Sequence, residues 1–312
     1  MSLNPCPCNN AEVSRLARQA GAVAVGFAEA TAVDDATADG FRRWLAAGCH
    51  GSMAYMERYV DLRLDPRLLV DGARTVISMA FPYAPIDGYH HPCISDYALG
   101  LDYHHVLRGR LQPVADAIVA AQGGEARICI DSAPVLERYW AVRAGVGFIG
   151  LNHQLIVPDM GAGMFLAEII TTAAFTPTAP CTLTCAGCRR CLTACPGHAL
   201  TESLSTLSPP LSTEIDARRC VSYLTIEHRG DLPADANLGT MVYGCDVCRR
   251  VCPHSAGAPA PLSEFAPRAE VMAHTRATLA AITAGPFRRL AAGSAIARIS
   301  AAQLRRNASA AK

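Results

Sequence analysis

The sequence predicts an α+β protein built from three parts. Residues 1–175 show helix and strand patterns in alternation, which is typical of an α/β layer domain with a sheet. Residues 176–260 hold most of the cysteines, and residues 261–312 are rich in alanine and arginine at helical spacing. We therefore expect a layered N-terminal domain, a small cysteine-dense domain and a short helical C-terminal segment.

The elements of the N-terminal part follow from apolar periodicity and from glycine or proline breaks. Helical spacing of apolar residues alternates with short apolar runs that fit buried strands. The expected elements are, in order, a helix and a strand within 11–30, a helix over 39–58 broken by Gly48 and Gly51, a strand at about 74–80, a helix over 102–122, a strand over 126–130, a helix in VLERYWAVRAGV, and strands around HQLIV and MFLAEIITT.

Composition narrows the class of protein. The formal net charge is +1, so no overall basic field indicates nucleic acid. Residues 1–10 lack the basic and apolar regions of a signal peptide, and no run of about 18 uncharged apolar residues is present. We expect a cytoplasmic protein that does not enter the membrane. Fourteen cysteines in such a chain indicate metal binding rather than a disulfide framework.

Two cysteine runs give the most specific signal. The first is Cys185-x2-Cys188-x2-Cys191-x3-Cys195-Pro196, and the second is Cys245-x2-Cys248-x3-Cys252-Pro253. This spacing is typical of ferredoxins with two [4Fe–4S] clusters, in which the last cysteine of each run ligates the other cluster. The second run lacks a third close cysteine, and Cys220 is the natural substitute. We assign Cys185, Cys188, Cys191 and Cys252 to one cluster, and Cys195, Cys220, Cys245 and Cys248 to the other.

A pair of structural zinc sites is the alternative to clusters. Zinc sites usually combine two CxxC pairs and do not need a CxxCxxCxxxCP run, so we favour the clusters. Cys181 could be a spare ligand, but the runs already supply eight thiolates, and we interpret it as a linker thiol.

Asp131 is a candidate acid because it directly follows the apolar strand RICI. Functional groups gather at the carboxyl ends of strands, and partial burial would raise the pKa of this carboxyl enough to let it donate a proton near neutral pH. The alternative is a helix cap, with Asp131 or Ser132 at the N-cap and Pro134 in the first turn. The residues alone leave both interpretations open.

Histidines and arginines elsewhere in the chain are weaker candidates. His104 and His105 are adjacent and point to different helix faces, so we expect surface or pocket-edge groups rather than a metal pair. The arginines of the C-terminal segment, Arg298 and Arg306 among them, could form a phosphate-binding face or a solvated helix face.

Stretches over most of the chain resemble the epoxyqueuosine reductases, a family of cobalamin-dependent iron–sulfur enzymes that modify tRNA. SAIARISAAQLRRNA is also similar to the start of the HEAT-like helical repeats of that family. The other similar stretches are HGSMAYMERYVDLRLDPRLLVDGARTVISM, SDYALGLDYHHVLRGRL, IDSAPVLERYWAVRAGVGFIG, CAGCRRCLTACP, RRCVSYLTIEHRGDLP and YGCDVCRRVCP.

The resemblance implies an activity and a second cofactor. The family reduces epoxyqueuosine to queuosine in tRNA, with base-off cobalamin held between the N-terminal domain and the ferredoxin-like segment. By matching motifs, Asp131 would be the proton donor. The resemblance also implies tRNA with a queuosine-type anticodon loop and a reduced donor such as flavodoxin or ferredoxin as partners, and we expect a monomer. The positions that would contact cobalamin are Arg63, Ser95, Asp131, Leu155, Leu166, Ser222, Cys245 and Asp246.

The resemblance divides the chain into a cobalamin-binding catalytic domain over 1–175, a two-cluster domain over 176–260 and a helical segment over 261–312. Leu151 stands where members of the family often have lysine. Three other functions stay open at this point. They are another cobalamin and iron–sulfur reductase such as a reductive dehalogenase, a two-cluster electron carrier, and an RNA-binding module with structural metal.

Overall fold

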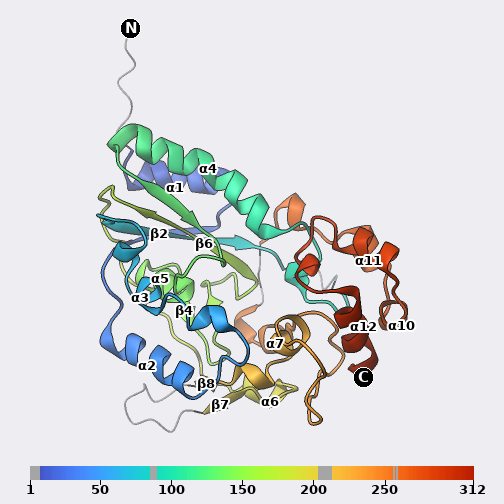
Figure 1. Ribbon diagram of the computed structural model, residues 1–312. Helices are drawn as coiled ribbons and strands as arrows, with labels where there is room; N and C mark the ends of the chain where they lie inside the picture. Colours follow the sequence, from blue (N-terminus) through green and yellow to red (C-terminus); the bar gives the residue numbers. More distant parts are fainter. Residues whose placement is uncertain (1–7, 85–89, 203–212, 256, 258) are drawn as a thin grey trace.

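A four-stranded antiparallel sheet forms the centre of the N-terminal part (Figure 1). In this computed structural model, residues 8–84, 90–202, 213–255, 257 and 259–312 are described. The strands are β1 (Ala24–Glu29), β2 (Thr75–Pro82), β6 (Met164–Thr171) and β3 (Ala126–Cys129), in that spatial order. Every residue of β2 is buried, because the strand is covered on both faces.

Helices cover both faces of this sheet. Helices α1 (Asn10–Gln19) and α4 (Tyr103–Gln122) lie together on one face, as Figure 1 shows. Helix α5 (Glu137–Arg143) packs against β1, β2 and β6 from the other. Each layer between helices and sheet has its own apolar core. The remaining helices of this part are α2 (Asp35–Ala46) and α3 (Val60–Leu64).

Short helices and two hairpins form the cysteine-dense part. Strand β4 (Phe148–Ile149) pairs with β5 (Leu155–Ile156), and β7 (Leu200–Glu202) pairs with β8 (Thr213–Ile215). The helices are α6 (Arg190–Ala194), α7 (Val221–Ile226) and α8 (Val247–Arg250). Single 3₁₀ turns lie at Ala54–Met56, Pro66–Leu68, Asp96–Ala98, Ala217–Arg219, Pro253–Ser255, Ser263–Phe265 and Ala295–Arg298.

The C-terminal helices share a core with the cysteine-dense part. This core joins buried residues of 93–99 and 217–243 to apolar side chains of the last helices. Helix α12 packs against both α10 and α7, and Figure 1 shows these helices as a lobe beside the sheet. The helices are α9 (Ala269–Met272), α10 (Arg276–Ala280), α11 (Ala284–Ala291) and α12 (Ala301–Ala310).

Most elements expected within 1–175 are confirmed, with one difference. The helix expected over 39–58 begins at Asp35 and ends at Ala46, because Asp34 caps its start and Gly48 and Gly51 adopt left-handed φ angles of 64° and 62°. The antiparallel sheet makes the fold α+β. Among the described residues, no helix has the length and apolar character needed to cross a membrane.

Candidate active site and cysteine groups

Four of the eight predicted cluster ligands surround one recess. Cys185, Cys188, Cys191 and Cys252 line it together with the turn between β4 and β5. Cys191 lies in α6 and Cys252 follows α8, and these two short helices pack on each other. The fold therefore brings the last cysteine of the second run to the first three of the first run. We call these four the outer cysteine group.

The other four ligands, which we call the inner cysteine group, lie at the ends of short helices. Cys195 ends α6, Cys220 caps the start of α7, and Cys245 and Cys248 lie at the start of α8. Burial raises the pKa of the Cys245 thiol to about 12, and the charges of Cys220 and Cys195 act in the same direction. A thiol with its pKa raised in this way ionises only when a cation binds it, which fits a metal ligand.

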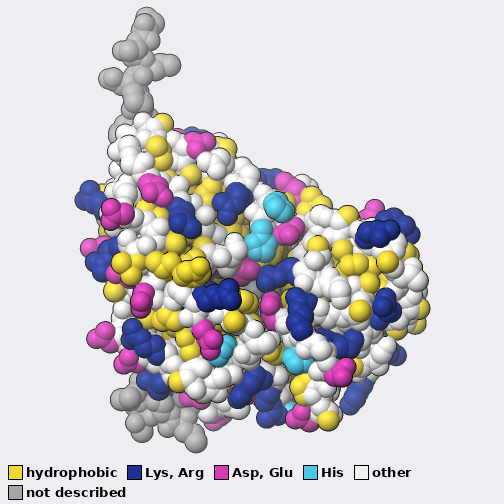
Figure 2. All heavy atoms as spheres, in the orientation of Figure 1, with side chains coloured by type: hydrophobic (Ala, Val, Ile, Leu, Met, Phe, Trp, Pro, Cys, Tyr) yellow, Lys and Arg dark blue, Asp and Glu magenta, His cyan; other side chains and the backbone are white. Residues whose placement is uncertain are grey.

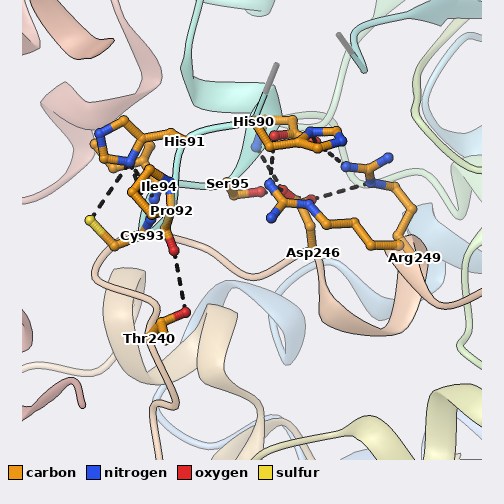
Figure 3. A network of polar contacts seen from close by, with 11 residues as sticks. His90, His91, Pro92, Cys93, Ile94, Ser95, Thr240, Asp246 and Arg249 are labelled. Atoms are coloured by element: carbon orange, nitrogen blue, oxygen red, sulfur yellow. Dashed lines mark hydrogen bonds and ion pairs between the residues drawn. The ribbon is translucent and has the colours of Figure 1, made fainter. Parts of the chain in front are cut away.

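A buried set of charges anchors α8 to the segment before α4 (Figure 3). The Asp96 side chain is fully buried and lies between two arginines and one histidine. Arg249 pairs with it, Arg250 Nη2 lies 2.7 Å from its Oδ1, and His90 Nδ1 lies 2.8 Å from its Oδ2. These contacts join parts of the chain that are far apart in sequence, and so fix the position of the second cysteine run.

Asp246 completes this anchor next to Cys245. Its Oδ1 accepts a hydrogen bond from Ser95 Oγ at 2.9 Å, and its Oδ2 accepts one from the backbone N–H of Asp96 at 2.7 Å. Gly244 precedes Cys245 with a φ of 67°, and a Cβ there would lie 2.6 Å from the Ser95 Cβ. Glycine is therefore needed for this close approach.

Asp131 lies just past the end of β3 in a left-handed conformation, with a φ of 51°. Such a conformation is uncommon outside glycine and clusters at functional sites. Its Oδ2 accepts a hydrogen bond from the Tyr103 hydroxyl at 2.8 Å and lies 3.3 Å from both His104 Nε2 and Arg298 Nη1. The side chain remains 47% exposed, so the carboxylate is fixed in place yet accessible.

His104 connects Asp131 to a second carboxylate. Its Nδ1 lies 2.8 Å from Asp102 Oδ1, which caps the same helix α4. Burial acts to lower the pKa of His104, but the hydrogen bonds to Asp102 and Asp131 outweigh it and raise the pKa to about 9. The imidazole is therefore protonated at neutral pH. The Tyr103 ring stacks between His104 and Phe165, which holds its hydroxyl toward Asp131.

The expected raised pKa of Asp131 is wrong. Burial acts to raise it, but hydrogen bonds from His104 and Tyr103 and the charge of Arg298 lower the pKa to about 2. The helix-cap interpretation is also wrong, because α5 begins only at Glu137. Asp131 is thus an ionised carboxylate that faces three donors.

Two further charged groups lie near Asp131, the half-buried Glu137 and the buried Arg63. Glu137 accepts a hydrogen bond from the backbone N–H of Asp131, and burial together with the charge of Asp131 raises the pKa of Glu137 to about 8. Arg63 is buried, its Nη2 donates to the Tyr55 carbonyl at 3.1 Å, and its Nε has no partner within the described part of the chain. Burial lowers the pKa of Arg63, while the charges of Asp131 and Glu137 act to raise it.

The residues expected at cobalamin fall into separate places. Arg63 and Asp131 interact electrostatically, and Ser95 and Asp246 hydrogen-bond beside Cys245. Leu155 and Leu166 both pack in the core between α5 and the sheet. Ser222 lies in α7, directly after the cap formed by Cys220.

Sequence reasoning missed the groups that hold Asp131. No sequence pattern marks Tyr103. The sequence places His104 only at a surface or pocket edge, and Arg298 is one of several arginines of the C-terminal segment. Only the Asp102–His104 spacing at the start of a helix gave a local signal. Arg306, by contrast, donates to the carbonyls of Leu224 and His228 and so stabilises the end of α7.

Two family models match the chain, one over a segment that includes Asp131 and one over the cysteine groups. A family model described as "Epoxyqueuosine reductase QueG, DUF1730" matches residues 63–132, which end just past Asp131. A second model, "4Fe-4S double cluster binding domain", matches residues 184–255 and so spans all eight cysteines of the two groups. The chain therefore contains a domain for two [4Fe–4S] clusters.

Whole-chain relatives agree with these matches. An epoxyqueuosine reductase of Cellulophaga algicola is 35% identical over 298 residues, which cover 92% of each chain. One of Gloeobacter violaceus is 39% identical over 311 residues, covering 96% of this chain and 94% of the relative.

Solved structures agree as well. A crystal structure of epoxyqueuosine reductase with a tRNA-Tyr epoxyqueuosine-modified stem loop has a TM-score of 0.82 at 27% identity, over 96% of this chain and 79% of the other. A Bacillus subtilis epoxyqueuosine reductase with its catalytic aspartate loop swung out of the active site has a TM-score of 0.80 over the same shares, again at 27% identity. The chain belongs to the epoxyqueuosine reductase family.

Proposed function

We propose that this protein reduces epoxyqueuosine to queuosine in tRNA and that Asp131 donates a proton to the departing epoxide oxygen. The observation that carries the proposal is the setting of Asp131, a half-exposed carboxylate held by Tyr103, His104 and Arg298. Carboxylates positioned by several donors at an accessible site act as acids and bases in proton transfer. Family membership supports the substrate, and the double-cluster domain supports reduction as the reaction.

The two cysteine groups are the proposed ligands of the clusters. One cluster would be held by the outer group, Cys185, Cys188, Cys191 and Cys252, and the other by the inner group, Cys195, Cys220, Cys245 and Cys248. The support is that the outer four line a single recess, while the inner four lie at the ends of the short helices α6, α7 and α8, where burial raises the pKa of Cys220, Cys245 and Cys248. Each cluster would take its last ligand from the other run, as two-cluster ferredoxins do.

Cobalamin is the second proposed cofactor, and one feature of the chain fits it. Arg63 has a buried Nε that finds no partner among the described residues, and an amide carbonyl of a corrin would satisfy it. Ser95 and Asp246 already bond each other, so their part would be to fix the loop that carries Cys245. The residues proposed to hold cobalamin are Arg63, Ser95, Asp131, Leu155, Leu166, Ser222, Cys245 and Asp246.

The reaction converts an epoxide, two electrons and two protons into an alkene and water. Bound cobalamin would supply electrons to the epoxide carbon at a low potential. Asp131 would pass a proton to the oxygen as the carbon–oxygen bond breaks. Because its resting state is ionised, the proton must come from a neighbour. The Tyr103 hydroxyl is closer, at 2.8 Å, but its pKa is strongly raised, so the protonated His104 at 3.3 Å is the more acidic source.

The substrate would be recognised as an anticodon stem loop with an unstacked base in the pocket. Figure 2 shows basic side chains along the crease between the sheet body and the C-terminal lobe, where phosphates would meet guanidinium groups. We propose a monomer that works in the cytoplasm with a reduced flavodoxin or ferredoxin. tRNA affinity should then fall steeply with salt.

The test is turnover by protein reconstituted anaerobically with iron, sulfide and cobalamin, followed by mass analysis of epoxyqueuosine-containing tRNA. Wild-type protein should convert the base, and Asp131→Asn should retain both clusters and the corrinoid spectrum while turnover falls by roughly 10²–10⁴-fold. Unchanged turnover in Asp131→Asn would remove this residue from the mechanism. Intact clusters without conversion of tRNA by the wild type would refute the function.

Metal analysis tests the ligand sets separately. Cys220→Ser should lose about half of the iron and sulfide, because it removes one corner of the inner cluster. Cys181→Ser is the matched control, since Cys181 packs beside Cys185 and Cys252 but belongs to neither group, and it should keep the full content. Equal losses in both variants would overturn the assignment.

A further inference from the structure

The two cysteine groups differ in their access to solvent. Cys188 of the outer group is exposed, and the nearby Leu183 is 52% exposed. Each member of the inner group is buried or half-buried. The proposed function requires that a protein donor reduce the two clusters. The donor can approach the outer group most closely, because Cys188 lies at the surface.

The inner group lies between this surface and Asp131. Cys191 of the outer group and Cys248 of the inner group pack in one small apolar core. On the other side, Cys220 is the N-cap of α7 and Glu227 is its C-cap, about 10 Å further along the helix. Glu227 Oε1 pairs with Arg298 at 3.0 Å, and Arg298 contacts Asp131. Electrons entering at the outer group would thus pass through the inner group toward the active site.

Arginines surround the exposed edge of the outer group. Arg189 and Arg190 directly follow Cys188, and both are exposed. Arg190 forms no ion pair or side-chain hydrogen bond within the described part of the chain, and it lines a surface recess with Arg250, Cys252, Pro253 and Ser255.

Nearby acids neutralise part of this charge. Arg189 pairs with Glu202 at 2.6 Å, and Arg250 is tied to the buried Asp96 and Asp246. Arg190 therefore supplies a positive charge beside the outer group that no acid of the described residues pairs with.

We propose that this surface, formed by Cys188, Arg189, Arg190, Arg250 and Pro253, is the docking site of an acidic one-electron carrier protein. The partner follows from charge complementarity, because uncompensated arginine beside a redox centre attracts a negatively charged surface and speeds its encounter. At each encounter the carrier loses one electron and the outer cluster gains it. The reduction of one epoxide needs two electrons and therefore two encounters. The proposal rests on the proposed function for the presence of the clusters.

The test compares two charge reversals in the full holoprotein. Arg190→Glu reverses the free charge, and a glutamate in the first turn of α6 does not oppose the helix dipole. Arg15→Glu is the control, since Arg15 is also exposed but lies in α1, at the end of the molecule far from α6 (Figure 1). Cluster bleaching is followed by stopped flow with a reduced acidic flavodoxin, and separately with reduced methyl viologen, a small cation.

Arg190→Glu should slow reduction by flavodoxin at low salt by about tenfold or more, with the difference shrinking as salt is added. Reduction by methyl viologen and viologen-driven tRNA turnover should not slow, because an arginine does not attract a small cation. Equal flavodoxin rates in Arg190→Glu and Arg15→Glu would overturn the docking site. A shifted potential with equal slowing by both reductants would also overturn it, since Arg190 would then only tune the cluster. Failure of the wild type to turn over with viologen would instead count against the proposed function.

Discussion

Replacing His104 with glutamine should remove a pH-dependent part of the free energy of unfolding. Burial acts to lower the pKa of His104, yet its contacts with Asp102 and Asp131 raise the pKa from 6.5 to about 9. One pKa unit corresponds to about 1.4 kcal/mol, so the pairing contributes about 2 to 3 kcal/mol after allowance for a partly exposed side chain. Because the folded pKa lies above the unfolded one, this contribution is complete below pH 6.5 and disappears as the pH rises through about 9.

The assay is guanidinium denaturation of anaerobic wild-type and His104→Gln protein at about pH 6 and about pH 10. The difference in unfolding free energy should be about 2 to 3 kcal/mol at the lower pH and close to zero at the higher. Thiols of the unfolded chain also titrate in this range, but both proteins share them. His105→Gln, at the exposed neighbouring position, should show no such dependence. A difference that stays constant with pH would refute the reasoning.

The same variant tests the proton supply. If His104 restores the proton of Asp131, turnover of His104→Gln should fall by on the order of 10²-fold, and the loss of wild-type turnover above pH 9 should flatten. Unaltered turnover with an unaltered pH profile would assign the proton to another source.

Two further variants probe the long-range contacts. Asp96→Asn leaves Arg249 and Arg250 with the single carboxylate of Asp246 and should lower the free energy of unfolding by about 3 kcal/mol in denaturation. Asp39→Asn, in an exposed pair, should change it by less than about 1 kcal/mol. Arg298→Gln should reduce tRNA turnover while iron content stays intact, because it frees Asp131 from the C-terminal lobe. Arg288→Gln, an exposed change in α11, should leave both the tRNA turnover and the iron content unchanged. Equal turnover in the two arginine variants would contradict the role of Arg298.

Local patterns were enough for most elements and for the cofactor class. The strand RICI, the helix over 102–122 and the glycine breaks depend on residues adjacent in sequence, so periodicity predicts them. The cysteine runs are equally local, and their spacing predicts two clusters before any fold is known. The helix over 39–58 was placed too late because the cap at Asp34 precedes the apolar pattern.

The chemistry of Asp131 could not be predicted in this way. Its position at a strand end was visible in the sequence, but the sign of its pKa shift depends on Tyr103, His104 and Arg298, which come from other elements. Arg298 lies in the C-terminal segment and reaches Asp131 only because the lobe of α10 to α12 packs beside the sheet. Burial alone argued for a raised pKa, and donors from distant elements reversed it.

The sequence by itself determined which groups are available, namely seven cysteines at cluster spacing with Cys220 as the eighth, and one acid after a strand. The motif also predicted that Cys252 joins the first run. Tertiary structure alone decided what surrounds the acid, because Tyr103, His104 and Arg298 come from other elements. The reason is that electrostatic and hydrogen-bond energies depend on distance in space, which chain separation does not fix.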